Sequence, residues 1–325
     1  MNSKFGNEQG SVLQQLRHRA GNDKKRIILP ESSDQRVVDA AEMIAERSLA
    51  IPVLLNHGDV PKGVECIDTN SDTQLFGRCA KRLFEHRQHK GLSLEAAALA
   101  LEDSLLLAAT LVSLGEVDGC VAGSVATTAN VIRAGLYGVG TKADAKLVSS
   151  FFLMELKDRC LTYADCGVVP APNSTQLAEI AMASAESHQL LTGEEPLVAM
   201  LSFSTLGSAD HESIHKIREA IQLAKTKCPD LKIDGELQFD AAFVTSVAQR
   251  KAPDSEVAGK ANVFIFPDLN AGNIAYKITE RLAGATALGP LIQGLAKPCM
   301  DLSRGCSAED IVDVAVVASV LAAAN

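Results

Sequence analysis

The stretch RIILPESSDQRVVDAAEMIAERSLAIPVLL, residues 26–55, contains two short apolar runs on either side of an amphipathic run. The runs at 26–31 and 51–55 have the length and apolar content of buried strands, whereas residues 34–49 have the spacing of a helix. A strand, a helix and a second strand in this order indicate two parallel strands joined by a helical crossover. This stretch therefore places the chain in the α/β class.

The same alternation continues along the rest of the chain. We expect strands at 117–123, 146–156, 161–169, 196–204, 262–268 and 285–292, and helices at 11–20, 76–90, 93–115, 128–138, 174–191, 213–227, 273–284 and 311–324. A length of 325 residues favours two domains with a cleft between them. In open α/β sheets ligands bind at the carboxyl ends of strands, so the turns that follow the strands are where we search for a site.

Composition excludes several classes of protein. The net charge of −9 and the scattered Lys and Arg residues argue against nucleic acid as a partner. Residues 2–25 lack the apolar core of a signal peptide, and no run reaches the roughly 18 apolar residues of a membrane span, so we expect no membrane association and a cytoplasmic location. The eight cysteines form no C-x-x-C pair and are expected to be thiols. Cys306 is the one candidate for a catalytic role among them, because it lies beside the start of a helix, where the pKa of a thiol is lowered.

The turn AGSVATTAN, residues 122–130, follows a predicted strand and opens a predicted helix. Ser124, Thr127 and Thr128 could simply cap that helix, which is the commoner use of such residues. Alternatively, Gly123 and these hydroxyl groups supply donors for a phosphate or carboxylate, and Arg133 on the same helix adds positive charge. Both interpretations stay open on spacing alone.

Two further polar turns follow strands in the second half of the chain. FPDLNAGN, residues 266–273, carries Asn270 and Asn273 before a helix, and it is either an ordinary Asn/Gly turn or part of a binding rim. LSFSTLGSAD, residues 201–210, is a third turn of this kind. Three polar turns at strand ends suggest a shared rim.

The stretch DLSRGCSAEDIV, residues 301–312, precedes the last apolar helix. Ser307 followed by Asp310 three residues later is a capping-box pattern. A helix N-terminus with Ser303 and Arg304 beside it is also suited to hold an anion. The two functions are compatible, because the positive helix end that needs a cap is also where an anion is stabilised.

Other motifs give negative expectations. The glycines at 135, 138 and 140 do not join a strand to a helix, and no phosphate-binding P-loop motif occurs. His211 with His215, and His86 with His89, have a spacing that suits chelation but lack a matching carboxylate pattern, so we expect solvated faces and no metal site. Arg36 and Arg87, judged by position alone, are expected in surface ion pairs.

From residue 122 onward the sequence strongly resembles the phosphate acetyltransferase family, including the type used in ethanolamine breakdown. The resemblance rests on AGSVATTANVIRAG, GELQFDAAF, KAPDSEVAGKANVFIFPDLNAGNIAYK and GPLIQGLAKPCMDLSRGCSAEDIV, with weaker likeness in LPESSDQRVVDAA and FEHRQHKG. It implies two three-layer α/β/α domains similar to isocitrate and isopropylmalate dehydrogenases, the first of residues 1–145 and 296–325 and the second of 146–295. It also implies a short catalytic form and a homodimer.

The same resemblance implies roles for individual residues. Asp310 matches the base that takes the thiol proton of coenzyme A, and Ser303 and Arg304 match the pair that orients thiol and acyl phosphate. Arg133 and Arg87 match arginines that bind substrate phosphates, and Arg36 matches one associated with the phosphates of the coenzyme. The implied reaction transfers acetyl between acetyl phosphate and coenzyme A, with orthophosphate as the other product and no permanently bound cofactor.

Proton transfer from a thiol near pKa ~8.5 to an aspartate near ~3.9 is uphill by about 4.6 units, or roughly 6 kcal/mol. Either desolvation of the carboxylate or an arginine that stabilises the thiolate must narrow this gap. We expect direct thiolate attack in a ternary complex rather than an acetyl-Cys306 or acetyl-Ser303 intermediate. A phosphate butyryltransferase, a non-catalytic acetyl-CoA sensor and, more remotely, a decarboxylating dehydrogenase are the competing interpretations.

Overall fold

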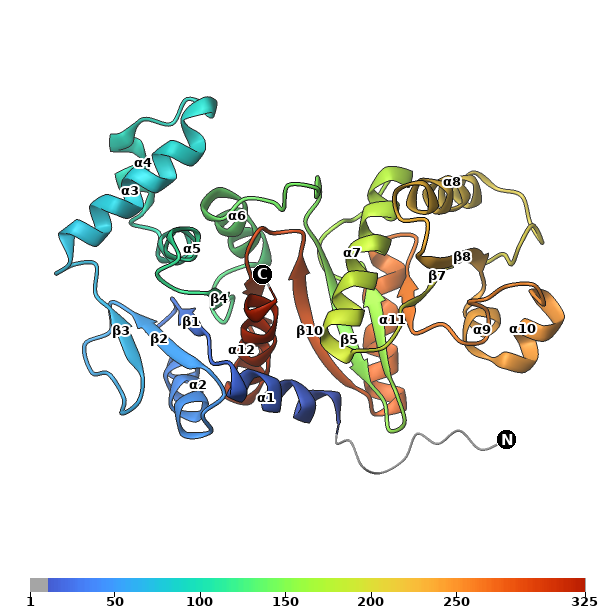
Figure 1. Ribbon diagram of the computed structural model, residues 1–325, viewed down its shortest axis with the longest axis horizontal. Coiled ribbons are helices and arrows are strands. Elements are labelled where there is room, and N and C mark those ends of the chain that lie inside the picture. The colour runs from blue at the N-terminus through green and yellow to red at the C-terminus, as the bar shows by residue number, and fades with distance from the viewer. Residues whose placement is uncertain (1–10, 325) are drawn as a thin grey trace. The chain divides into compact units, whose positions relative to one another are not determined.

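The computed structural model describes residues 11–324 (Figure 1), and this part of the chain forms two compact units. The terminal unit comprises residues 13–144 and 295–324, and the central unit comprises Ala145–Gly294 together with Val12. Residues 1–10 lie outside the described residues. They include the start of the predicted first domain and part of the segment 2–25, in which we expect no signal peptide.

The terminal unit is built on a five-stranded sheet in the order β11-β4-β1-β2-β3, and every strand pair in it is parallel. Its strands are β1 (Arg26–Leu29), β2 (Ile51–Leu55), β3 (Glu65–Ile67), β4 (Gly119–Ala122) and β11 (Cys299–Asp301). The predicted strand, helix and strand of residues 26–55 are confirmed, with Ile28 of β1 opposite Val53 of β2. The side chains of Ile27, Ile28 and Leu29 are fully buried, which explains why β1 is apolar along its length.

Helices cover both faces of this sheet (Figure 1). Helices α2 (Gln35–Glu46) and α12 (Ala308–Ala323) pack against each other on one face, and α5 (Ser104–Leu114) and α6 (Thr128–Gly138) pack against each other on the other. The remaining helices of this unit are α1 (Val12–Asn22), α3 (Thr73–Arg87), the 3-10 helix η1 (Gln88–Lys90) and α4 (Leu94–Ala100). These layers give the α/β/α arrangement that the alternation predicts.

The single helix predicted for residues 93–115 is wrong, because the chain bends by 115° between α4 and α5. Asp103 causes the break, since its carboxylate accepts a hydrogen bond from the backbone N–H of Leu105 and begins a new helix. Within residues 11–324 no single helix is long and apolar enough to cross a membrane, although α4 and α5 taken together reach that length and composition as a bent pair.

The central unit contains a mixed six-stranded sheet in the order β10-β5-β6-β9-β7-β8. The pairs β10–β5 and β5–β6 are antiparallel and the other pairs are parallel. The strands are β5 (Ser149–Glu155), β6 (Cys160–Ala164), β7 (Leu197–Leu201), β8 (Lys232–Leu237), β9 (Val263–Ile265) and β10 (Thr286–Gln293). The helices are α7 (Ser174–Thr192), α8 (Glu212–Lys227), α9 (Phe239–Phe243), α10 (Thr245–Lys251) and α11 (Leu269–Ala283).

The strand order of the terminal unit fixes where a ligand crevice can lie. From β1 the chain continues to β2 and β3 on one side, whereas β4 and β11 are added on the other side. The order therefore reverses between β1 and β4, and the carboxyl ends of these two strands are the topological switch point of the sheet. The turns after β1, β4 and β11 come together there.

Candidate active site at the ends of three strands

The structure gathers nine of the eleven predicted site residues in the terminal unit. Eight of them belong to the turns after β1, β4 and β11 or to the helices that start from these turns: Arg36, Ser124, Thr127, Thr128, Arg133, Ser303, Arg304 and Asp310. Arg87 is the last residue of α3, which follows β3. Asn270 and Asn273 belong to the central unit. The switch point and most of the predicted chemistry therefore coincide in one unit.

Arg36, in the first turn of α2, ties the three turns together. Its guanidinium donates to the carbonyl oxygens of Ser124 at 2.9 Å, Arg304 at 2.9 Å and Cys306 at 2.8 Å. It also forms a forked pair with Asp34 through Nε at 3.1 Å and Nη2 at 2.7 Å, and this pairing lowers the pKa of the Asp34 carboxyl. These contacts use the five N–H groups of the guanidinium, so the side chain acts here as a clamp between loops.

Glu31, just after β1, fills the anion-binding turn predicted at 122–130. One carboxylate oxygen accepts from the backbone N–H groups of Gly123 and Ser124 at 2.6 and 2.8 Å and from the Ser124 hydroxyl at 3.1 Å. The other accepts from the backbone N–H groups of Val125 and Ala126 at 3.1 and 2.7 Å. The turn does bind a carboxylate as its residue types suggest, but the carboxylate is the chain's own, and Ser124 is buried by it.

The two threonines that follow have different environments. Thr127 caps α6, and its hydroxyl oxygen accepts from the backbone N–H of Asn130 at 3.3 Å. Thr128 donates its hydroxyl hydrogen to Oδ2 of Asp301 at 2.6 Å. Asp301 is the last residue of β11 and is fully buried, and burial raises the pKa of its carboxyl to about 6.

Ser303 and Arg304 are separated from Asp301 by the buried Leu302 and are exposed. The capping box predicted for α12 is confirmed. The Ser307 hydroxyl oxygen accepts from the backbone N–H of Asp310 at 3.2 Å. Oδ2 of Asp310 accepts from the Ser307 N–H and from the Ser307 hydroxyl, both at 2.8 Å. Oδ1 of Asp310 has no hydrogen-bond partner among residues 11–324, and the side chain is exposed. An exposed carboxylate held at one oxygen can still accept a proton at the other.

Cys306 lies in the same turn but is 7% exposed. Burial raises the pKa of its thiol, although Arg36 acts in the opposite direction with Nη1 3.9 Å from Sγ. A thiol with a raised pKa is a poor nucleophile near neutral pH. This environment favours a packing role for Cys306.

Arg87 contacts α6, the helix that carries Arg133. The Arg87 guanidinium carbon lies 3.8 Å from the centre of the Tyr137 ring, an arrangement that stabilises a cation over an aromatic face. Tyr137 is one helical turn beyond Arg133, so the two basic side chains are associated with the same side of the helix. The exposed Arg133 also donates to Oδ1 of Asn130.

The predicted turn at 266–273 is wrong in one respect, because α11 begins at Leu269 and therefore includes both asparagines. Asp268 caps the helix by accepting from the backbone N–H of Ala271 at 3.0 Å. Asn273 donates through Nδ2 to the carbonyl oxygen of Cys166 at 3.1 Å, and Asn270 is exposed. Gly272 allows close packing here, since a Cβ on it would lie 2.2 Å from the carbonyl oxygen of Asp165.

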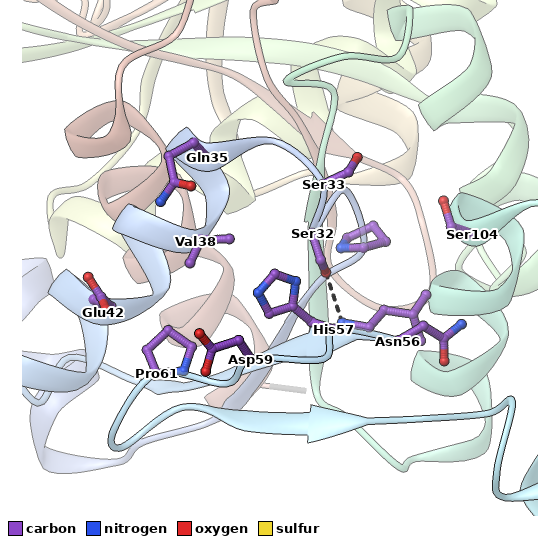
Figure 2. A pocket seen from close by; sticks show the side chains of 12 residues that line it. Ser32, Ser33, Gln35, Val38, Glu42, Asn56, His57, Asp59, Pro61 and Ser104 are labelled. Atoms are coloured by element: carbon purple, nitrogen blue, oxygen red, sulfur yellow. Dashed lines mark hydrogen bonds between the residues drawn. The ribbon is translucent and has the colours of Figure 1, made fainter.

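An open pocket of about 750 Å³ lies at the ends of β1 and β2 (Figure 2). Figure 2 shows Ser33, Gln35, Asn56 and His57 around it, with Glu42 and Asp59 also in the lining. Its lining contains no Lys or Arg and none of the predicted site residues. The pocket therefore lacks the positive charge that a phosphate-bearing ligand requires. Among residues 11–324 no three His, Cys, Asp or Glu side chains are grouped to hold a metal ion.

Sequence reasoning missed three acidic residues that organise the site. Glu31 and Asp34 stand in LPESSDQR, directly after the first predicted strand. Asp34 precedes a predicted helix, which is the position of an N-cap, and Glu31 could accept from the backbone N–H groups of a neighbouring turn. Asp301 was visible as the first residue of DLSRG. The strand β11 that buries Asp301 has only three residues, too few for a period-2 pattern.

Comparison with known proteins identifies the family of the chain. The family model described as "Phosphate acetyl/butaryl transferase" matches residues 11–319. A phosphate acetyltransferase from Acetivibrio thermocellus is 48% identical over 96% of this chain and 98% of its own length. The EutD phosphotransacetylase from Staphylococcus aureus superposes with a TM-score of 0.89 at 36% identity, over 97% of this chain and 100% of its own.

A more distant similarity supports the fold alone. A protein described as a 4-hydroxythreonine-4-phosphate dehydrogenase from Salmonella typhimurium superposes with a TM-score of 0.53 at 12% identity, over 92% of this chain and 99% of its own. This confirms the predicted α/β fold with two helix-flanked sheets and its likeness to a dehydrogenase. Given the match over nearly its whole length, the chain is an enzyme of the phosphate acetyl/butaryl transferase family.

Proposed function

We propose that the chain is a phosphate acetyltransferase that transfers acetyl between acetyl phosphate and coenzyme A, with orthophosphate as the other product. The observation that carries the proposal is that Ser303, Arg304 and Asp310 are all exposed in the segment that follows β11, at the switch point of the terminal sheet. The relatives' names support the acetyl group as the one transferred. Coenzyme A acts as a co-substrate and not as a permanently bound cofactor.

In the proposed mechanism Asp310 accepts the thiol proton of coenzyme A, and the thiolate attacks the acetyl carbonyl in a ternary complex. The S–C bond forms as the carbonyl oxygen becomes an oxyanion, which Arg304 stabilises, and Ser303 orients the reacting groups. The oxyanion then re-forms the carbonyl double bond, and the bond between the acyl carbon and the oxygen that bridges it to phosphorus breaks. The electron pair of that bond leaves with orthophosphate. No acyl-enzyme is formed, which is consistent with the buried thiol of Cys306 and its raised pKa.

Proton transfer to an ordinary aspartate is uphill by roughly 6 kcal/mol, and this gap must be narrowed. Asp310 is exposed, so burial of its carboxylate does not supply the reduction of this free-energy gap. The exposed Arg304 is six residues away in the same segment and is available to stabilise the thiolate instead. We therefore assign the lowering of the thiol pKa to Arg304 and the final proton acceptance to Asp310.

The leaving phosphate moves towards the basic side of α6 in this proposal. Arg133 and Arg87 supply the positive charge, and Thr127 and Thr128 supply hydroxyl groups at the helix N-terminus. Ser124 supports this site indirectly, because its N–H and hydroxyl donate to Glu31 and its carbonyl oxygen accepts from Arg36. Arg36 can reach a coenzyme phosphate only by giving up one of its present bonds, and Asn270 and Asn273 remain proposed substrate ligands from the central unit.

The test is coenzyme A-dependent release of phosphate from acetyl, propionyl and butyryl phosphate by the wild type, Asp310→Asn and Arg304→Ala. Acetyl turnover by the wild type, with kcat lowered by about 10² or more in both variants, would support the function and the roles. Faster turnover of butyryl phosphate than of acetyl phosphate would identify the chain as a phosphate butyryltransferase instead. No turnover, despite tight binding of acetyl-CoA, would identify a non-catalytic sensor.

We also propose that the chain is a cytoplasmic homodimer, since two-fold dimers are the commonest assembly. Support comes from α11, whose Ile274, Ile278 and Leu282 recur at helical spacing and are 56%, 52% and 84% exposed. A second copy would remove such an apolar stripe from water. Sedimentation velocity of the wild type and of Ile278→Glu tests this proposal: a dimer in the first and a monomer in the second would support it, and a monomeric wild type would overturn it.

A further inference from the structure

Asp301 is a buried acid that the proposed mechanism does not use. It lies at the end of β11 opposite Ala122 of β4, and it has no exposed surface. Oδ2 accepts the Thr128 hydroxyl hydrogen at 2.6 Å, whereas Oδ1 has no hydrogen-bond partner among the described residues. A fully buried carboxylate oxygen without a partner is costly when the group is ionised.

Thr128 connects this acid to the surface. It is the first residue of α6, is only partly buried, and follows the turn on which the proposed phosphate site depends. A hydroxyl group has one hydrogen to donate. While Asp301 is ionised that hydrogen is committed to Oδ2, and only oxygen lone pairs are left to face an anion.

We propose that Asp301 is a positioning residue that sets the direction of the Thr128 hydroxyl, and that the protonated acid frees this hydroxyl to donate to a phosphate oxygen of the substrate. In the protonated state Asp301 donates its own hydrogen from Oδ2 to Thr128 Oγ1. The threonine hydrogen then turns outward to the substrate. This inference rests on the proposed function, because it takes Thr128 as a ligand of the substrate phosphate.

The surroundings of Asp301 favour the protonated state. The titratable and charged groups on the elements packed against β11 are Cys120 on β4, Arg133 and Tyr137 on α6, and Glu309, Asp310 and Asp313 on α12. Of these groups only Arg133 carries a positive charge that could stabilise the ionised acid. The charge that acts on Asp301 is the carboxylate of Glu31, and it is repulsive. Burial and this repulsion outweigh the Thr128 hydrogen bond and the backbone N–H of Leu302, which both lower the pKa, and raise the pKa of Asp301 to about 6. A bound phosphate dianion adds a second repulsion and shifts the group further towards the acid.

The experiment measures KM for acetyl phosphate and kcat between pH 5.5 and 8 in the wild type and in Asp301→Asn. The amide of the variant presents an N–H group to Thr128 at every pH. Because the substrate's own titration is the same for both proteins, the ratio of their KM values isolates Asp301. We expect this ratio, wild type over variant, to rise by about ten-fold from the acid to the alkaline end, with little change in the ratio of kcat values.

Two further variants keep the test decisive if Asp301→Asn fails to fold. Thr128→Val should raise KM most at acid pH and flatten the profile, and Thr128→Ser should restore the wild-type profile. Asp313→Asn is the matched control, since it changes another buried aspartate with a raised pKa in the same unit and should leave the profile unchanged.

Parallel KM profiles of wild type and Asp301→Asn would overturn the inference, as would a Thr128→Val profile that keeps the wild-type shape. Either result with an active wild type would leave the proposed function intact. An inactive wild type, in contrast, would overturn the proposed function itself.

Discussion

The guanidinium of Arg36 donates to the carbonyl oxygen of Cys306 at 2.8 Å, although the two residues are 270 positions apart. The same side chain holds the carbonyl oxygens of Ser124 and Arg304. Backbone carbonyls near a proposed catalytic turn thus have a charged donor, which gives shorter and stronger hydrogen bonds than a neutral one. Arg36 thereby sets the geometry of residues it does not adjoin in sequence.

Arg36→Ala should lower both kcat and Tm, because three turns lose a common donor at once. Arg36→Lys should recover only part of the loss, since an ammonium group cannot reproduce the planar fork. Arg78→Ala is the matched control: its partner Glu116 is also acidic, but Arg78 is 57% exposed and distant from these turns. Steady-state kinetics and thermal melts of the three variants measure this. An Arg36→Ala enzyme with wild-type kcat would refute the clamp.

Glu31→Gln should destabilise the fold by about 2–4 kcal/mol. The carboxylate accepts from four backbone N–H groups and one hydroxyl, and the amide nitrogen of the variant would face donors instead of accepting from them. Urea unfolding monitored by circular dichroism gives the free energy. Glu42→Gln, an exposed change on α2, should cost under about 0.5 kcal/mol. Equal losses in the two variants would contradict the role of Glu31.

Gly123→Ala should be much more damaging than Gly91→Ala. Both glycines have positive φ, +110° and +84°, so both variants strain the backbone. Only at Gly123 would the new Cβ also lie 2.6 Å from Oδ1 of Asp301 and 2.7 Å from the backbone nitrogen of Leu302, whereas at Gly91 nothing lies within 4 Å. We expect about 1 kcal/mol for Gly91→Ala and at least 3 kcal/mol for Gly123→Ala, measured by urea unfolding. Similar values would show that the turn yields to the added methyl group.

Asp310→Asn and Ser307→Ala should separate the two uses of the α12 N-terminus. The asparagine variant can still accept from the Ser307 N–H, so it should keep its stability and lose about 10² or more in kcat. The alanine variant should lose about 1 kcal/mol of stability and much less activity. Kinetics and urea unfolding on both proteins check this. If Asp310→Asn lost only stability, its carboxylate would be a cap and not a base.

Asp301 should make the protein less stable as the pH rises from about 4 to above 6. Its pKa is about 6 in the folded state against 3.8 for the ordinary group, so in this window the folded state binds more protons than the unfolded state. The difference of about two units corresponds to about 3 kcal/mol at full ionisation. Asp301→Asn should therefore gain stability relative to the wild type between pH 4 and 7.5. A difference that stays constant with pH would contradict the raised pKa.

The sequence predicted the parts of the site that depend on local pattern. The strand predicted at 26–31, which the structure forms over Arg26–Leu29, and the capping box of Ser307 and Asp310 need only neighbouring residues, and both are confirmed. The break at Asp103 was missed because the apolar spacing continues through it, and β3 and β11 are too short to show a period. The occupation of the 123–126 turn by Glu31 depends on two strands that are 90 residues apart in sequence, and no local pattern reports such a contact.

The position of β11 has a consequence for how the protein is made. A ribosome synthesises β1 and β4 early, but β11, which flanks β4, and the carbonyl groups of Arg304 and Cys306, which Arg36 holds, emerge only after the whole central unit. Until then the growing chain exposes one edge of β4 and the face of the sheet that α12 will cover. The last thirty or so residues thus complete the sheet whose first strands are made earliest, and we expect the chain to be most prone to aggregation just before they emerge.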